Sequence, residues 1–180
     1  MKNQNTKKLA YAALFLVLCL VLPMLTGQIP QIGSMLLPMH IPVLLCGLVC
    51  GWQYGAAVGF VAPLLRSVLF GMPPMYPVAI AMAFELLTYG LVIGLVYRRM
   101  AQKGAAGVYA ALLTAMVAGR LVWGVAEVVL LGLGGKAFTA QAFLAGALLN
   151  AVPGIIVQLV LIPAVMAALQ KAGAVKEYAE

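Results

Sequence analysis

Long apolar stretches, separated by short segments rich in glycine, proline or charged residues, make up most of this chain of 180 residues. A helix needs about 20 apolar residues to cross the hydrocarbon core of a bilayer. We therefore expect an all-α integral membrane bundle of six transmembrane helices, forming a single domain over residues 1–180. The second span is short, which favours a partial or tilted crossing. The predicted spans are Leu9–Leu25, Pro38–Cys50, Tyr54–Phe70, Pro77–Tyr97, Ala105–Leu133 and Ala142–Leu169.

The composition supports a membrane protein without an ATPase domain of its own. Hydrophobic residues make up 65% of the chain and charged residues 8%, and the mean hydropathy is +1.09. A soluble domain of this size would carry far more charged surface. The sequence contains neither a GxxxxGK[ST] phosphate loop nor a GxGxxG motif, so ATP-driven work would require another subunit. We expect no cleaved signal peptide, because the first apolar run continues through Pro23 without a small-residue cleavage site.

The net charge of +7 lies mostly at the predicted ends of the spans. Membrane proteins concentrate lysine and arginine on the cytoplasmic side. Six spans satisfy this rule with both termini cytoplasmic, whereas five spans would place a basic terminus outside. This placement explains the charge by topology, and we expect no nucleic acid partner. The basic residues on the predicted inner side are Lys2, Lys7, Lys8, Arg98, Arg99, Lys103, Lys171 and Lys176.

Several polar residues lie within the apolar runs at similar predicted depth. An ionisable side chain at the centre of a membrane helix costs about 2.5–3.5 kcal/mol on insertion scales, so such residues usually face the protein interior. Arg120, Trp123 and Glu127 follow helical spacing and share one face. Gly146, Asn150, Gly154 and Gln158 would form a similar ladder on the sixth span. The predicted substrate-binding residues are His40, Arg66, Glu85, Arg120, Trp123, Glu127 and Asn150.

Structural roles account for the same residues and stay open from sequence alone. The two arginines and two glutamates could pair with one another and only lock the bundle. His40 could cap a helix, and Asn150 could bond across helices without touching a ligand.

Catalytic chemistry has little support in this sequence. Ser34 and Ser67 are its only serines, it contains no aspartate, and one histidine cannot build a typical zinc site. Cys46 and Cys50 lie one turn apart without further ligands nearby, and with Cys19 they are expected to be packing residues. We therefore expect no enzyme activity, no metal site and no cofactor.

A family resemblance is carried by residues 39–69, MHIPVLLCGLVCGWQYGAAVGFVAPLLRSVL. This segment resembles the substrate-binding S components of energy-coupling factor (ECF) vitamin transporters. In that family, a proline-containing helix start leads into an apolar run and a glycine-rich turn. The matching positions are Ile41, Pro42, Gly47, Gly51, Gly55 and Gly59. The six-span length and the basic segments agree with the family over essentially the whole chain.

The resemblance implies a role in transport at a bacterial cytoplasmic membrane. An S component captures a vitamin from outside, docks on a transmembrane scaffold subunit with two cytoplasmic ATPases, and topples to release the solute. The first helix commonly docks through an A-x-x-x-A patch; here Ala10 and Ala13 are the candidates, although Leu14 and Val17 stand where the second alanine of the motif would be. The outer loops 26–37, 71–77 and 132–141 are candidate lids.

Only the chemistry of the predicted site residues narrows the range of possible ligands. Two arginines near a pocket suit a carboxylate, which they bind through bidentate, charge-assisted hydrogen bonds. Pantothenate carries a carboxylate, an amide and hydroxyl groups, and is a substrate class of the resembled family. Other vitamins and nucleobase precursors stay open, as do a solitary carrier and a structural membrane protein.

Overall fold

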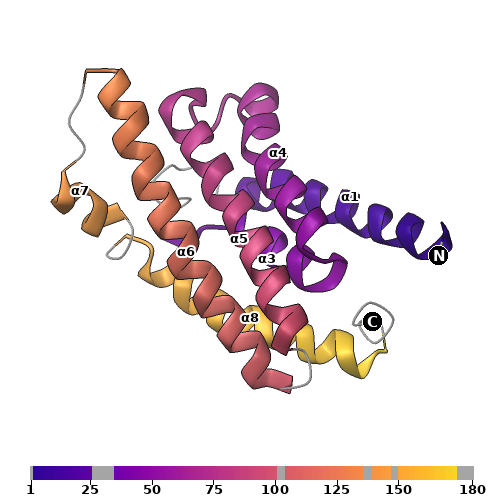
Figure 1. Cartoon of the computed structure of the whole chain (residues 1–180). Helices are drawn as coiled ribbons and strands as arrows, with labels where there is room; N and C mark the ends of the chain where they lie inside the picture. The colour runs from indigo at the N-terminus through magenta and orange to yellow at the C-terminus, as the bar shows by residue number, and fades with distance from the viewer. Residues whose placement is uncertain (1, 26–34, 101–103, 136–138, 147–149, 174–180) are drawn as a thin grey trace.

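The computed structural model describes residues 2–25, 35–100, 104–135, 139–146 and 150–173. This part of the chain is helical and contains no strand. The order along the chain is α1 (Lys2–Leu25), α3 (His40–Cys50), α4 (Trp52–Phe70), the π-helical turn η1 (Met75–Ala79), α5 (Ile80–Met100), α6 (Gly104–Leu133), α7 (Ala140–Leu144) and α8 (Val152–Lys171). Figure 1 shows α5 near the middle of the bundle, with α6 and α8 crossing on one side and α1 extending away on the other.

Five helical segments are long and apolar enough to cross a membrane. They are Gln4–Leu25, Trp52–Phe70, Met75–Met100, Gly104–Leu133 and Val152–Lys171. α3 is shorter than these five segments. Its 11 residues reach only about 16 Å, roughly half the thickness of the hydrocarbon core. The prediction of six spans is therefore not confirmed. Five candidate spans lie among the described residues, and whether α3 crosses the membrane in part stays a prediction.

The predicted continuous sixth span, Ala142–Leu169, is wrong. The short helix α7 ends at Leu144, and α8 begins only at Val152. Pro153 explains where α8 starts, because proline lacks an N–H donor and suits the first turn of a helix. The predicted polar ladder from Gly146 to Gln158 consequently does not lie on one helix.

Close backbone contacts join α3, α4 and α5. A Cβ atom added to Gly55 would lie 2.7 Å from the Cα of Gly47, and one added to Gly90 would lie 2.2 Å from the carbonyl carbon of Gly55. Four residues along α4, a Cβ on Gly59 would lie 2.2 Å from the carbonyl oxygen of Leu86. Small residues let membrane helices approach this closely. We call this contact, made by Gly47, Gly55, Gly59 and Gly90, the glycine seam.

The link between α3 and α4 is a single residue. Gly51 has φ of 98° and ψ of 167°, a backbone conformation that residues with a side chain rarely adopt. The following helix already begins at Trp52, so the turn is tighter than the sequence suggested. This one glycine reverses the chain and aligns α3 antiparallel to α4.

Apart from Arg66 and Arg120, the described lysines and arginines gather toward one end of the bundle. Lys7 and Lys8 lie near the start of α1, Arg98 and Arg99 in the last turn of α5, and Lys171 in the last turn of α8. In Figure 1 these helix ends point toward the lower right, whereas α7 lies at the far left. We call the two ends the basic end and the α7 end.

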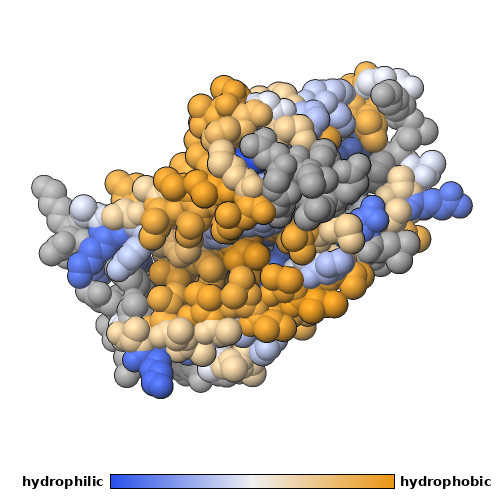
Figure 2. Space-filling view, turned by 180° about the vertical axis from the view of Figure 1, so that it is seen from behind, coloured by the Kyte–Doolittle hydropathy of each residue, from blue (hydrophilic) through white to orange (hydrophobic). Residues whose placement is uncertain are grey.

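Apolar side chains cover much of the outer surface. Figure 2 shows a broad hydrophobic area across the middle of one face, with hydrophilic residues mostly toward its two sides. Val117 and Val125 of α6 and Val160 of α8 are among the large apolar residues that stay exposed. An apolar patch of this extent is typical of a surface that meets lipid. The surface therefore agrees with a bundle embedded in a bilayer.

Candidate functional site

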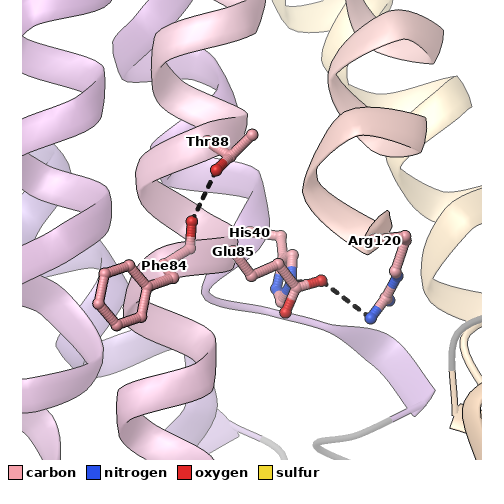
Figure 3. Close-up of polar contacts among 5 residues, drawn as sticks. All are labelled: His40, Phe84, Glu85, Thr88 and Arg120. Carbon is pink, nitrogen blue, oxygen red and sulfur yellow. Dashed lines mark hydrogen bonds and ion pairs between the residues drawn. The ribbon is translucent and has the colours of Figure 1, made fainter. Parts of the chain in front are cut away.

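Glu85 is the centre of a buried polar cluster contributed by three helices. Its Oε1 atom lies 2.9 Å from an Nη atom of Arg120 on α6 and 3.4 Å from Nε2 of His40 at the start of α3. Glu85 and His40 are each 1% exposed. Figure 3 shows the three side chains converging, while Thr88 turns away and donates to the carbonyl of Phe84 on its own helix. We call His40, Glu85 and Arg120 the polar cluster.

The packing of the helices explains why these residues meet. Gly47 of α3 contacts Gly90 of α5. Because α3 and α5 run in the same direction, His40, which precedes Gly47 on α3, lies near the level of Glu85, which precedes Gly90 on α5. The antiparallel pair of α5 and α6 is fixed by contacts of Gly119 with Tyr89 and of Gly107 with Met100. The same register places residues 120–123 of α6 beside residues 85–88 of α5. The backbone contacts therefore set the geometry of the cluster.

Aromatic rings border the polar cluster. The ring of Tyr89 meets that of His40 edge-on, with centroids 5.2 Å apart. The guanidinium of Arg120 lies 5.9 Å from the ring of Trp123, which in turn stacks on Phe143 of α7 at 6.0 Å. Such rings offer flat apolar surface beside charged groups and attract cations to their faces. Arg120 thus bridges a buried carboxylate and an aromatic wall.

Glu127 extends the acidic character of this region. It follows Arg120 by two helical turns, is 7% exposed, and interacts with Trp123 one turn before it. The α5–α6 register places it about one turn, or roughly 6 Å, from the level of Glu85 toward the α7 end. The charge of Glu85 also acts on Glu127. The two carboxylates therefore belong to one electrostatic environment.

Several buried polar atoms in this region have no hydrogen-bond partner among the described residues. They are Nδ1 and Nε2 of His40, Oε1 of Glu85, whose ion-pair contacts lack hydrogen-bond geometry, and Nε and one Nη of Arg120. Nε2 of Gln158 on α8 is also buried without a partner. Buried polar atoms in proteins nearly always have a partner, and an exception calls for an explanation. Hydrogen-bonding capacity of this kind would suit a small polar molecule with both donors and acceptors.

Arg66 lies outside the polar cluster. Its guanidinium donates to the carbonyl of Leu20 on α1 and lies 5.3 Å from the ring of Phe70. The α4–α5 register places Arg66 beside Ala79, six residues before Glu85 and therefore about 9 Å closer to the α7 end. This arginine fastens α4 to α1 instead of joining Arg120.

Asn150 also lies apart from the polar cluster. It is exposed in the turn before α8, and its backbone N–H donates to the carbonyl oxygen of Ala145 at 2.9 Å. The remaining predicted residues, His40, Glu85, Arg120, Trp123 and Glu127, form one contiguous region.

A comparison with protein families agrees with this geometry. Residues 7–167 match the family described as ECF transporter, substrate-specific component. The chain belongs to that family. The match spans all of the residues in the polar cluster and its aromatic border. Comparisons with curated proteins and with solved structures gave no significant match.

Membership of the ECF family establishes the general role of the chain. ECF substrate-specific components are membrane transporter subunits, work with ECF scaffold and ATPase modules, and bind small substrates. The family is one of transporters and not of enzymes. Among the described residues, no three His, Cys, Asp or Glu side chains come together as a metal site would require. That the polar cluster of this ECF subunit binds the substrate stays a prediction.

The predicted docking residues lie on an exposed face of α1. Ala10 and Ala13 are exposed together with Leu14 and Val17, whereas Ala12 is buried against the bundle. A flat apolar face with two small residues suits close approach of another membrane helix. Its role in docking stays a prediction.

The predicted lid loops are described only in part. Residues 26–34 and 136–138 lie outside the described residues. At the end of the 71–77 segment, the hydroxyl of Tyr76 donates to the carbonyl of Leu130, which fastens η1 to the last turns of α6. Thr139 accepts a hydrogen bond from the backbone N–H of Ala142 and so caps α7.

Sequence reasoning missed the contributions of Phe143 and Gln158. Phe143 lies in an otherwise apolar segment, and nothing in its local pattern separates it from a lipid-facing residue. Two glycines make room for the aromatic pair: a Cβ on Gly124 would lie 2.4 Å from the ring of Phe143, and one on Gly146 would lie 2.7 Å from that of Trp123. The sequence shows Gln158 as an amide within an apolar run, and this is the signal that could have singled it out.

Proposed function

We propose that this ECF subunit binds its solute at the polar cluster, against the wall formed by Trp123 and Phe143. The single observation that carries the proposal is the burial of Glu85 between Arg120 and His40. Ionisable side chains inside a membrane bundle are costly and usually mark a solute or ion pathway. The unpartnered nitrogen atoms of His40 and Arg120 support the same assignment.

The proposed cycle follows from the partners of the family. The subunit captures a solute, docks on the ECF scaffold through the α1 face around Ala10 and Ala13, and topples in the membrane to release the solute. Two ATPase subunits supply the energy of hydrolysis. The exposed alanines on α1 support this docking surface.

The proposed orientation has the basic end in the cytoplasm and the α7 end outside, in the cytoplasmic membrane of a bacterium. The positive-inside rule supports this orientation. Glu85 lies five residues from the start of α5 and thirteen before Arg98, which places it about 8 Å from the outer end of that helix. In this orientation, the polar cluster therefore lies nearer the outer end of α5 than its cytoplasmic end.

The proposed solute is a vitamin or a similar micronutrient. Arg66 and Arg120 suggest pantothenate, because two arginines could bind its carboxylate, and Arg120 is the one that lies in the polar cluster. Binding of pantothenate is tested first, together with neutral and cationic vitamins.

One observation favours a purely structural role as a second candidate. Glu85 and Arg120 already form an ion pair, and such a pair could stabilise the bundle without any ligand. A solitary carrier that needs no ATPase differs from the first proposal only in its partners.

Purification of the full chain in detergent tests these functions. The first proposal expects a small molecule to be released on denaturation and identified by mass spectrometry, and expects scaffold and ATPase subunits to copurify from mild detergent. Bound solute without ATPase subunits would indicate a solitary carrier. Absence of any bound or bindable solute would leave the structural role.

A further inference from the structure

The charges around the polar cluster suggest which class of solute it accepts. Glu85 and Glu127 each contribute a carboxylate, and Arg120 contributes a guanidinium. With His40 neutral, these groups carry one net negative charge; with His40 protonated, they carry none. In neither state does the site hold excess positive charge to neutralise an anion.

Among the described residues, the other cationic side chains lie outside the polar cluster. Arg66 on α4 is bonded to the carbonyl of Leu20 and lies about 9 Å from the level of Glu85. Lys7 and Lys8 on α1, Arg98 and Arg99 on α5 and Lys171 on α8 lie toward the basic end. Among the described residues, Arg120 is thus the only arginine or lysine in the polar cluster, and it is already ion-paired with Glu85.

We infer that the site selects a solute that lacks a carboxylate and carries a positive charge or N–H donors, which bind Glu127 beside the aromatic wall of Trp123 and Phe143. This inference rests on the proposed solute-binding function and narrows its substrate class. It disfavours pantothenate and other carboxylate vitamins.

Two physical reasons support the choice. A carboxylate that bound the unpartnered Nε and Nη of Arg120 would place a second negative charge beside Glu85 on a single cation, and like charges repel strongly where water is excluded. It would also enter the field of Glu127. A cation or N–H donor meets the opposite situation, because Glu127 accepts hydrogen bonds and aromatic rings attract positive charge.

The unpartnered donors of the site fit the same solute class. Nε and one Nη of Arg120 need acceptors, and a carbonyl, a hydroxyl or a ring nitrogen supplies one without adding negative charge. The inferred solute is therefore a compact nitrogen-containing molecule with neutral acceptors.

Matched probes that differ in charge test the inference. We would measure binding to the purified full chain by calorimetry with nicotinate, nicotinamide and 1-methylnicotinamide, and with pantothenate and its alcohol panthenol. The solute released from the denatured protein would be identified by mass spectrometry. We expect the released solute to lack a carboxylate, and the anionic member of any set that binds to be at least tenfold weaker.

The outcomes separate this inference from the function on which it rests. A released solute or tightest probe that carries a carboxylate would overturn the inference and leave solute binding intact. No released solute and no binding of any probe would overturn the proposed function itself.

The variant Glu127→Gln gives an independent test, because glutamine keeps the shape of the side chain and removes its charge. We expect it to weaken binding of the released solute about tenfold without lowering the thermal stability of the unliganded protein. Thr114→Ala is the matched control on α6, since Thr114 is exposed and bonds only the carbonyl of Ala110. Unchanged affinity in Glu127→Gln would show that Glu127 does not select the charge of the solute.

Discussion

The two sides of α5 are built in different ways. Toward α3 and α4, the glycine seam brings backbone against backbone, so that the nearest atoms to Gly55, Gly59 and Gly90 are carbonyl and Cα atoms. Toward α6 and α7, several glycines instead face aromatic side chains, as Gly119 faces Tyr89 and Gly124 faces Phe143, although Gly107 meets the backbone of Met100. α8 also packs only lightly on α6 and α3, whereas α4 and α5 pack extensively.

This difference indicates a division of labour within the bundle. Backbone contacts cannot yield without moving whole helices, whereas a side chain can change rotamer at small cost. The seam therefore fixes the position of Glu85, and the α6–α8 side provides groups that can adjust around a solute. Variants on each side should accordingly affect different properties.

The largest expected effect is at the seam. Gly90→Leu would place a side chain into the backbone of Gly55, which we expect to cost about 3 kcal/mol or more because overpacking forces the helices apart. The measurement is the yield of monodisperse protein in detergent and its melting temperature.

Gly132→Ala is the matched control for the seam, since nothing lies within 4 Å of a Cβ added there. The control should behave as the native protein. A native-like melting temperature for Gly90→Leu would show that the seam does not hold the three helices together.

The next effect is at the polar cluster. Arg120→Ala leaves Glu85 buried without its cation, and removal of one partner from a buried pair costs about 3–5 kcal/mol. We expect lower stability and at least a tenfold loss of solute affinity.

The double variant Glu85→Gln/Arg120→Met separates stability from binding, because it removes both charges together. It should recover most of the stability but not the affinity. Native affinity in the double variant would assign the pair a structural role only.

Arg66→Ala sharpens the contrast with Arg120. The loss of one buried hydrogen bond to Leu20 should lower stability by about 1–3 kcal/mol. Solute affinity, measured by calorimetry, should change less than threefold because Arg66 lies outside the polar cluster. A tenfold loss of affinity with native stability would instead restore Arg66 as a ligand contact.

Phe143→Ala tests the adjustable side. It removes the ring that stacks on Trp123 while leaving the seam untouched, and we expect a loss of affinity of about tenfold with little change in melting temperature. Phe60→Ala is the matched control, since that ring lies on α4 and meets Phe84 away from the polar cluster. Equal losses in both variants would argue against a specific role for Phe143.

The smallest effect on binding is expected at the proposed docking face. Ala13→Trp should leave solute affinity unchanged and reduce transport in cells or reconstituted vesicles, because a bulky ring would keep the scaffold away from α1. Val117→Trp, at an exposed position on α6, should leave both properties unchanged. Loss of binding together with transport in Ala13→Trp would reject docking through this face.

The sequence by itself determined the membrane character of the chain, its helical class and several helix ends, because apolar length and glycine or proline punctuation are local properties. The predicted ends at Phe70 and Leu133 agree with α4 and α6. Five of the seven predicted site residues lie in one region, since ionisable residues inside apolar runs are rare enough to be recognised from sequence.

Only the tertiary structure decided which of these residues meet. Arg66 and Arg120 look alike in sequence, yet one bonds a backbone carbonyl of α1 and the other bonds Glu85. The register between helices makes that difference, and it is set by backbone contacts between residues far apart in the chain, such as Gly55 with Gly90. The packing of Phe143 on Trp123 follows from the same cause, because it depends on how the chain between α6 and α8 folds back, which local apolar periodicity does not encode.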